Sequence, residues 1–298
     1  MLTIKAWLFV AIGVVTVFFI WTWFSLIRRR QSRGRTAPQP LDLGIGFVTN
    51  FFDTLGIGSF ATTTSTYKLL KRVRDEDIPG TLNVGHTVPV ITQAFIYIAI
   101  VEVDMTTLIS LISASVLGMW FGAGVVSKLP RRPIQIGMGI ALLVAAALTL
   151  MTIYNKQASG GEALGLTGVS LVIAIIGNFI LGSLLALGIG SYGPSLIMIS
   201  LLGMNPIAAF PIMMGSAAFM MPTGSTRFIV KERYNLRAAL GLALGGIPAV
   251  LLAAYIVRSL NLYYVRWLVV IVVVYAALTL LRSAWVERRL IRVQEAEA

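Results

Sequence analysis

The chain has 298 residues, of which 57% are hydrophobic and 12% charged, and its formal net charge is +12. Apolar runs of about 20 residues recur from end to end, which is typical of a polytopic membrane protein and excludes an ordinary soluble domain. The absence of Cys excludes disulfides and thiolate metal sites, and a single His leaves little for a metal cluster. The basic residues lie in short loops between apolar runs, so they indicate membrane topology and argue against nucleic acid as a partner.

The first apolar run covers 6–27 and leads directly into Arg28, Arg29 and Arg30. It is too long for the apolar core of a signal peptide, and no small-residue cleavage site follows it. We therefore predict an extra N-terminal transmembrane helix within 1–32, with its N-terminus outside. A basic cytoplasmic linker follows at 33–41.

Eight further candidate membrane segments follow in chain order: 43–67, 80–102, 106–127, 133–153, 169–203, 205–228, 237–257 and 263–283. If every segment crossed once, the basic stretches that follow 67 and 127 would lie outside, against the positive-inside rule. The conflict disappears if 43–67 and 169–203 each enter and leave on one side, as broken re-entrant hairpins. The loops 28–40, 68–77, 128–132, 227–237 and 282–292 then all become cytoplasmic and hold 20 of the 24 Lys and Arg residues.

The two predicted hairpins share a phrase, LGIGSF at 55–60 and LGIGSY at 187–192. A shift of 132 aligns the phrases, and a shift of 130 aligns the helices that follow, from Asn83 and from Met213. Each half then contains one hairpin and three crossings, an odd number, so the halves have opposite orientations, as in many secondary transporters. A duplication without mechanistic use is the alternative.

The predicted fold class is an all-α polytopic membrane protein built on an inverted repeat. Each half has one re-entrant broken hairpin and three transmembrane helices, and the N-terminal helix is extra. The expected units are the first repeat at 42–153, an extracytoplasmic loop at 154–168, the second repeat at 169–283 and a cytoplasmic tail at 284–298.

The glycine-rich turns predict a binding site. They place backbone polar groups near the bilayer centre, which is tolerated only beside a cavity or inside protein. A half-helix that begins after Gly58 or Gly190 would direct free N–H groups and a positive dipole end there, and this suits an anion. The candidate substrate-binding residues at the turns are Gly56, Gly58, Ser59, Gly188, Gly190 and Ser191, with Thr62, Thr63 and Ser195 as nearby hydroxyl donors. Close helix packing by small residues is the alternative.

A polar stripe follows each hairpin. On 80–102, Asn83, His86, Gln93 and Tyr97 fall within roughly 80° of arc at 100° per residue. The corresponding helix carries Ser216, Thr223 and Arg227. We interpret the stripes as two walls of one cavity, with Asn83, His86, Gln93, Ser216, Thr223 and Arg227 as substrate-binding candidates. Interhelical hydrogen bonding is the alternative for the stripes, and a cytoplasmic-end anchor is the alternative for Arg227.

Two ionisable residues are candidates for proton coupling. His86 is the single histidine, and Asp53 is the one carboxylate that we expect deep in the membrane. Packing is the alternative role for His86. Asp53 has three candidate roles: to carry a proton, to pair with His86 or Arg227, or to accept hydrogen bonds from the hairpin amides. We expect no catalytic residue, no metal and no cofactor.

The hairpins, the polar-striped helix and the segment layout over about 42–283 resemble the TauE/SafE, or sulfite exporter-like, membrane transporters. The stretch LGIGSYGPSLIMISLLG at 187–203 is similar to the glycine-rich signature of that family, whereas SFATTTSTYKLL at 59–70 departs from it. The resemblance implies a secondary transporter, and not an enzyme, that exports sulfite or small organosulfonates across the inner membrane. Its partners would be a small anionic substrate and the lipid bilayer, its C-terminus would be cytoplasmic, and a homo-oligomer is left open.

Two other functions are left open. PTGSTRF at 222–228 loosely resembles a phosphate loop, so a membrane-embedded lipid-pyrophosphate phosphatase is one alternative, although such chemistry needs more intramembrane acids or a metal. A cation-coupled amino-acid carrier is the other, in which Asp53 and the hairpin carbonyls would hold Na⁺.

Overall fold

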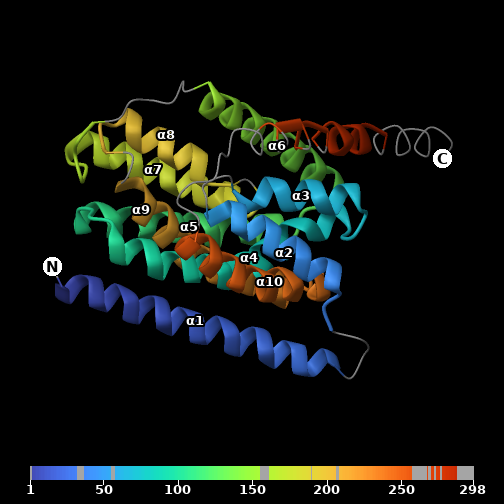
Figure 1. Cartoon of the computed structure of the whole chain (residues 1–298). Helices are drawn as coiled ribbons and strands as arrows, with labels where there is room; N and C mark the ends of the chain where they lie inside the picture. Colours follow the sequence, from blue (N-terminus) through green and yellow to red (C-terminus); the bar gives the residue numbers. More distant parts are fainter. Residues whose placement is uncertain are drawn as a thin grey trace.

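The computed structural model describes residues 2–31, 37–54, 58–154, 161–188, 190–205, 208–256, 267, 270–271, 273–275 and 277–286. Within these ranges the chain is helical and contains no strand (Figure 1). The helices are α1 (Leu2–Gln31), α2 (Pro40–Thr54), α3 (Ser59–Leu69), the 3-10 helix η1 (Asp75–Asp77), α4 (Ile78–Ile100), α5 (Met105–Val126), α6 (Arg131–Ile153), α7 (Gly168–Leu185), α8 (Tyr192–Leu201), α9 (Ala209–Val230) and α10 (Leu236–Ile256). A shorter apolar helix covers Val273–Val286.

Five of these helices are long and apolar enough to cross a membrane: α1, α5, α6, α7 and α10. Their outward faces carry large apolar side chains, such as Trp7 at 70% exposure and Val169 at 76%. So much outward apolar surface is unfavourable in water and matches a hydrocarbon solvent. The chain is therefore a helical membrane protein.

The two polar-striped helices, α4 and α9, form the centre of the bundle (Figure 1). They pack on each other, and α10 covers α4 while α5 covers α9. They have 23 and 22 residues, long enough to span a bilayer at about 1.5 Å per residue, but their polar side chains lower their hydropathy. Because α4 and α9 lie at the centre of the bundle, neighbouring helices and not lipid surround most of their surface.

Glycines bring two pairs of helices into backbone contact. On α5, a Cβ added to Gly118 would lie 1.9 Å from the Phe179 carbonyl oxygen of α7. On α10, a Cβ added to Gly245 would lie 2.1 Å from the Leu43 carbonyl oxygen of α2. Both belong to Gly-x-x-x-Gly patterns, 118–122 and 241–245, which permit this close approach.

Each glycine phrase separates two consecutive helices, α2 from α3 and α7 from α8, that fold back on each other. At the open end of the α2–α3 hairpin, Arg72 Nη2 donates to Gln39 Oε1 at 2.7 Å and to Asp42 Oδ2 at 2.9 Å. At the open end of the α7–α8 hairpin, Asn205 N donates to the Ala163 carbonyl oxygen at 2.8 Å. The two predicted helix breaks are therefore present, although 55–57, including Gly56, lie outside the described residues.

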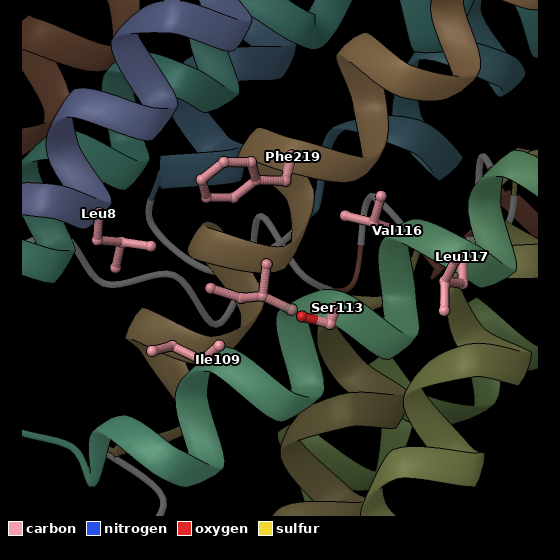
Figure 2. A pocket seen from close by; sticks show the side chains of 7 residues that line it. Leu8, Ile109, Ser113, Val116, Leu117 and Phe219 are labelled. Atoms are coloured by element: carbon pink, nitrogen blue, oxygen red, sulfur yellow. The ribbon is translucent and has the colours of Figure 1, made fainter.

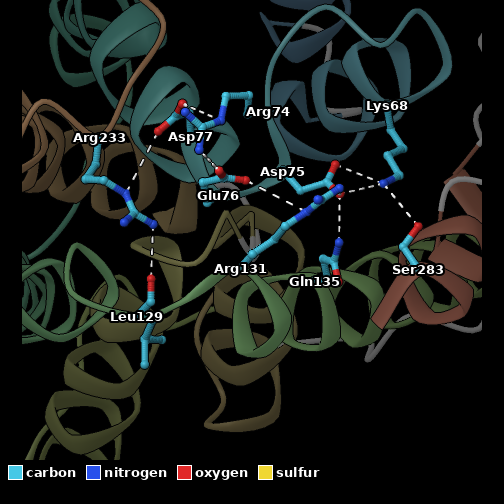
Figure 3. Close-up of polar contacts among 10 residues, drawn as sticks. All are labelled: Lys68, Arg74, Asp75, Glu76, Asp77, Leu129, Arg131, Gln135, Arg233 and Ser283. Atoms are coloured by element: carbon cyan, nitrogen blue, oxygen red, sulfur yellow. Dashed lines mark hydrogen bonds and ion pairs between the residues drawn. The ribbon is translucent and has the colours of Figure 1, made fainter. Parts of the chain in front are cut away.

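An ion-pair cluster joins several basic loops at one end of the molecule (Figure 3). Asp75 Oδ2 accepts from Lys68 Nζ at 2.8 Å, from Gln135 Nε2 at 2.9 Å and from Arg131 Nη2 at 3.2 Å. Burial raises the pKa of Asp75, but the hydrogen bonds and charge of Lys68, with Gln135 and Arg131, outweigh it and hold the pKa below its ordinary value. Arg233 Nη2 reaches the Leu129 carbonyl oxygen at 3.0 Å. The loops after α3, before α6 and after α9 thus meet.

The opposite end of the molecule contains the start of α5 and the segment that leads into α7. There Asp104 N donates to the Leu164 carbonyl oxygen at 2.8 Å, and Leu166 N donates to Thr107 Oγ1 at 2.9 Å. The start of α5 is thereby tied to the segment that leads into α7. The basic loops and the α7–α8 hairpin ends consequently lie at opposite ends of the bundle.

Candidate functional site

The tips of the two hairpins approach each other beside α4. A Cβ added to Gly190 would lie 3.9 Å from the Cβ of Phe60, in the first turn of α3. Tyr192, two residues further, directs its hydroxyl to Gln93 Oε1 of α4 at 3.3 Å. The repeated phrases are thus joined through one helix, α4.

The turns require glycine for conformational reasons. Gly58 has φ +90° and Gly188 has φ +88°, the left-handed region that side chains with a Cβ rarely adopt. Each turn ends one short helix and reverses the chain toward the next. The glycines of the phrase thus have a structural role in addition to any contact with a ligand.

The first tip is occupied by the carboxylate of Asp53, which is 2% exposed. Its Oδ1 accepts from Ser59 N, at the start of α3, at 2.6 Å. Its Oδ2 accepts from Gln93 Nε2 at 2.9 Å, and the same nitrogen reaches Thr54 Oγ1 at 3.0 Å. Of the three roles expected for Asp53, the described geometry corresponds to acceptance from a hairpin amide.

His86 is buried and hydrogen-bonded on both ring nitrogens. Its Nδ1 lies 2.9 Å from Asn50 Oδ1, and its Nε2 lies 3.0 Å from Thr63 Oγ1. Asn50 Nδ2 donates to the Gly46 carbonyl oxygen at 2.7 Å, which orients Asn50 Oδ1 as the acceptor for His86. A neutral imidazole that donates from Nδ1 and accepts from Thr63 satisfies all these groups.

The polar stripe of α4 reaches both hairpins. Tyr97 Oη donates to the carbonyl oxygen of Thr54, the last residue of α2, at 2.9 Å. Asn83 Nδ2 donates to the carbonyl oxygen of Leu185, the last residue of α7, at 3.3 Å. Helix ends leave carbonyl groups without intrahelical partners, and these side chains satisfy one at each break.

The second tip has no such carboxylate. The position equivalent to Asp53 under the 132-residue shift is Leu185. Ser191 precedes α8 without a side-chain capping bond, and Gly190 is exposed. Ser195, one turn into α8, is 2% exposed, and its Oγ has no hydrogen-bond partner among the described residues. Ser195 lies one turn after Ser191 on the chain, so this buried hydroxyl lies within one helical turn of the tip.

The candidates on α9 lie apart from these contacts. Thr223 Oγ1 donates to the Phe219 carbonyl oxygen at 2.8 Å, within its own helix. Ser216 is 2% exposed, and its Oγ also lacks a partner in the described ranges. The Arg227 guanidinium stacks on Trp120 of α5 at 4.1 Å from the ring centre. Ser225 of α9 contacts α4 at Thr87, which lies beside the stripe, with 3.2 Å between Ser225 Oγ and Thr87 Oγ1.

Sequence reasoning missed Asn50, Thr54 and Tyr192 as members of this network. Asn50 lies one turn before Asp53 on α2, and Tyr192 closes the second copy of the repeated phrase. Their spacing was therefore visible, but which helix each side chain contacts depends on packing. In the described ranges, His, Asp and Glu form no group of three or more that could hold a metal ion.

Comparison with protein families gives one match for this chain. The family model described as sulfite exporter TauE/SafE matches residues 1–150, half of the chain, which includes the first hairpin, α4 and α5. No curated protein matches the chain, and neither does any solved structure.

Proposed function

The chain belongs to the sulfite exporter TauE/SafE family, and from this we propose that it is a secondary transporter that exports small sulfur-containing anions across the inner membrane. Sulfite and small organosulfonates are the substrate class. The observation that carries the proposal is the uncapped start of α8 at an exposed glycine turn.

The second tip has the chemistry that a sulfite or sulfonate group needs. In the first turn of α8 the N–H groups of Tyr192 and Gly193 have no intrahelical acceptors, Pro194 has no N–H, and the positive end of the helix dipole is located there. Three oxygens of the anion would accept from these amides and from Ser195 Oγ. This site requires no arginine, because backbone donors at a helix start bind anions by themselves.

The first tip differs because Asp53 occupies the equivalent location. Its carboxylate already accepts from Ser59 N, so it takes the place that an anion would otherwise fill. A second substrate anion there would meet a buried negative charge without a cation beside it. We therefore assign one substrate anion to each cycle, bound at the second tip.

The pattern of helix packing supports an inverted repeat. In the proposed repeat, α2, α3, α4 and α5 correspond to α7, α8, α9 and α10. The α2–α10 contact then corresponds to α7–α5, the α4–α10 contact to α9–α5, and the α3–α4 contact to α8–α9, and all six contacts exist. The α4–α9 contact converts into itself. Two halves related by a two-fold axis in the membrane plane produce this pairing, and substrate sites of such transporters lie near the midplane.

Proton coupling, where it operates, is assigned to Asp53 rather than to His86. Asp53 is connected through Gln93 to Tyr192, beside the second tip, whereas His86 is bonded to the neutral groups of Asn50 and Thr63. Protonation of Asp53 would weaken its hold on Gln93 and so affect the tip where the anion binds.

Counterflow in proteoliposomes tests the function. Labelled sulfite, taurine and thiosulfate would be loaded with and without a pH gradient, and we expect saturable exchange of at least one of them. Gly190→Val places its side chain at the tip, where among the described residues the Phe60 Cβ at 3.9 Å is the one atom within 4 Å of the added Cβ, and it should abolish exchange. Gly13→Val, in open space on α1, is the matched control. Exchange by Gly190→Val at the wild-type rate would overturn the site.

The competing functions give different outcomes in the same preparation. Phosphate release from a prenyl pyrophosphate without anion exchange would favour the phosphatase, and Na⁺-driven amino-acid uptake would favour the cation-coupled carrier.

Membrane topology is tested by a separate experiment. Because the chain has no Cys, single Cys residues can be introduced and labelled from either side. A Cys at Lys71 should label from the cytoplasm and a Cys at Leu164 from outside, and labelling of both from one side would contradict the re-entrant arrangement.

A further inference from the structure

The membrane-facing surface between α5 and α9 combines an apolar pocket with uncompensated positive charge. We call it the α5–α9 seam and define it by Leu117, Trp120 and Gly124 on α5 and by Phe219, Thr223 and Arg227 on α9. Both helices end near the basic loops, and they pack against each other along their length. No substrate contact described above uses this surface.

The pocket lies in the half of the seam away from the basic loops. It has a volume of about 430 Å³ and lies between α1, α5 and α9, with Leu8, Val116 and Phe219 around it (Figure 2). Ile109 and Leu117 at its edge are 46% and 62% exposed, so it opens toward lipid. Apart from Ser113 its lining is apolar, and a space of this kind suits a hydrocarbon chain.

The charge lies at the other half of the seam. The Arg227 guanidinium stacks on Trp120, which is 54% exposed, and a Cβ at Gly124 would lie 2.7 Å from Arg227 Nη1. Lys128 follows the end of α5 by two residues and Lys231 follows Arg227 by one turn, so both lysines lie at the same end of the two helices as Arg227. None of these three cations pairs with a carboxylate among the described residues, and Arg227 Nε is buried without a hydrogen-bond partner.

The distance between the charged half and the apolar half of the seam matches the length of one lipid molecule. Phe219 and Arg227 are eight residues apart on α9, which corresponds to about 12 Å at 1.5 Å per residue. One leaflet of hydrocarbon is about 15 Å deep, half of a ~30 Å core. A headgroup beside Arg227 therefore allows its acyl chain to reach the pocket beside Phe219.

We propose that the α5–α9 seam binds an anionic phospholipid of the inner leaflet. Its phosphate would lie among Arg227, Lys128 and Lys231, and one acyl chain would pass Trp120 into the apolar pocket. Basic sites between transmembrane helices on the cytoplasmic side bind anionic lipid headgroups by the same chemistry. The bound lipid would hold α5 against α9, one of the two contacts that cover the central helices.

Native mass spectrometry of the purified protein tests the lipid site without measuring transport. Phosphatidylglycerol and phosphatidylcholine of equal chain length would be titrated, and we expect the wild type to retain phosphatidylglycerol selectively. Each basic residue near an anionic surface contributes roughly fivefold to binding, so the double variant Arg227→Gln/Lys231→Gln should bind phosphatidylglycerol roughly 25-fold more weakly. Lys71→Gln, which removes an exposed cation at the same end but off the seam, is the matched control.

Two further experiments distinguish binding of the lipid headgroup from binding of the acyl chain. Ser113→Phe fills the pocket and should weaken binding of the long-chain lipid, and soluble glycerol phosphate should fail to displace it. Equal retention of both lipids by the wild type, full retention by the double variant, or displacement by glycerol phosphate would each overturn the proposal. Lys128→Gln/Lys231→Gln changes exposed side chains alone, so it gives the same test if the Arg227 variant does not fold.

Discussion

Two glycines on α2, two residues apart, should respond in opposite directions to the same substitution. A Cβ on Gly46 would lie 2.6 Å from the Gly241 carbonyl oxygen and 2.7 Å from Leu242 Cα, both backbone atoms of α10. A Cβ on Gly44 meets nothing within 4 Å. Gly46→Ala therefore tests whether the backbones of α2 and α10 are truly in contact, and Gly44→Ala is its control.

The magnitude follows from these distances. Carbon atoms pack at about 3.5 to 4.0 Å, and no side-chain rotation can relieve a clash with backbone, so α10 must move away from α2. Overpacking of this kind costs about 1–3 kcal/mol. Ala in place of Gly within a helix gains about 1 kcal/mol at either position. The two variants should thus differ by about 2 kcal/mol, with Gly44→Ala more stable than the wild type and Gly46→Ala less stable.

The assay is the thermal unfolding midpoint of the purified protein in detergent, followed by intrinsic Trp fluorescence. At roughly 2–4 °C per kcal/mol for a chain of this size, Gly46→Ala should unfold roughly 6 °C below Gly44→Ala. Equal midpoints would refute the close α2–α10 contact. They would also remove one of the paired contacts that support the two-fold relation between the halves.

Three further substitutions test the polar contacts. Asp53→Leu leaves Ser59 N–H without its acceptor, a cost of about 1–3 kcal/mol, and removes one of the two acceptors of Gln93 Nε2, whereas Asp53→Asn should recover part of this loss; equal Tm values for the two variants would contradict this. Because the folded-state pKa of Asp75 is lowered, its contribution to stability is complete above its unfolded pKa of about 4 and is lost as pH falls below that value. The Tm of the wild type should therefore fall more steeply with pH than that of Asp75→Asn, and parallel curves would show that the ion pairs contribute nothing. Tyr192→Phe removes the 3.3 Å hydrogen bond to Gln93, so the free energy of unfolding should fall by at most about 1 kcal/mol. Stimulation of counterflow by a pH gradient should nevertheless be lost, and unchanged stimulation would exclude Tyr192 from coupling.

The difference between the two tips is the main functional lesson of the structure. The phrases LGIGSF and LGIGSY are nearly identical, yet Asp53 occupies the first tip and Leu185 holds the equivalent position in the second. In the inverted repeat that we propose, two similar helix starts lie near the middle of the membrane. The carboxylate of Asp53 makes the first of them part of the protein's internal hydrogen bonding, and the second is the one to which we assign the anion.

The helices and their breaks were predictable from local sequence. Runs of apolar residues have the length of a membrane span, and a glycine at positive φ ends a helix. The breaks between α2 and α3 and between α7 and α8 therefore depend on residues close together in the chain. The basic loops were equally visible, and several of them do meet at one end, around Asp75. A rotation of 100° per residue puts Asn83, His86, Gln93 and Tyr97 on one side of α4, which we interpreted as a cavity wall. Their described contacts with the hairpins are interhelical hydrogen bonds, the alternative that we gave for the stripe.

By itself, the sequence determined that this is a helical membrane protein with two interrupted segments and a polar central helix, because segment length, glycine placement and charge are local properties. Only the tertiary structure decided which partner each buried polar group has. Asp53 contacts Ser59 and Gln93, and Arg227 turns toward Trp120 rather than toward the tips. The physical reason is that the rotation of a helix about its axis depends on how closely its neighbours pack, and the glycines of α5 and α10 determine that distance through residues remote in the chain.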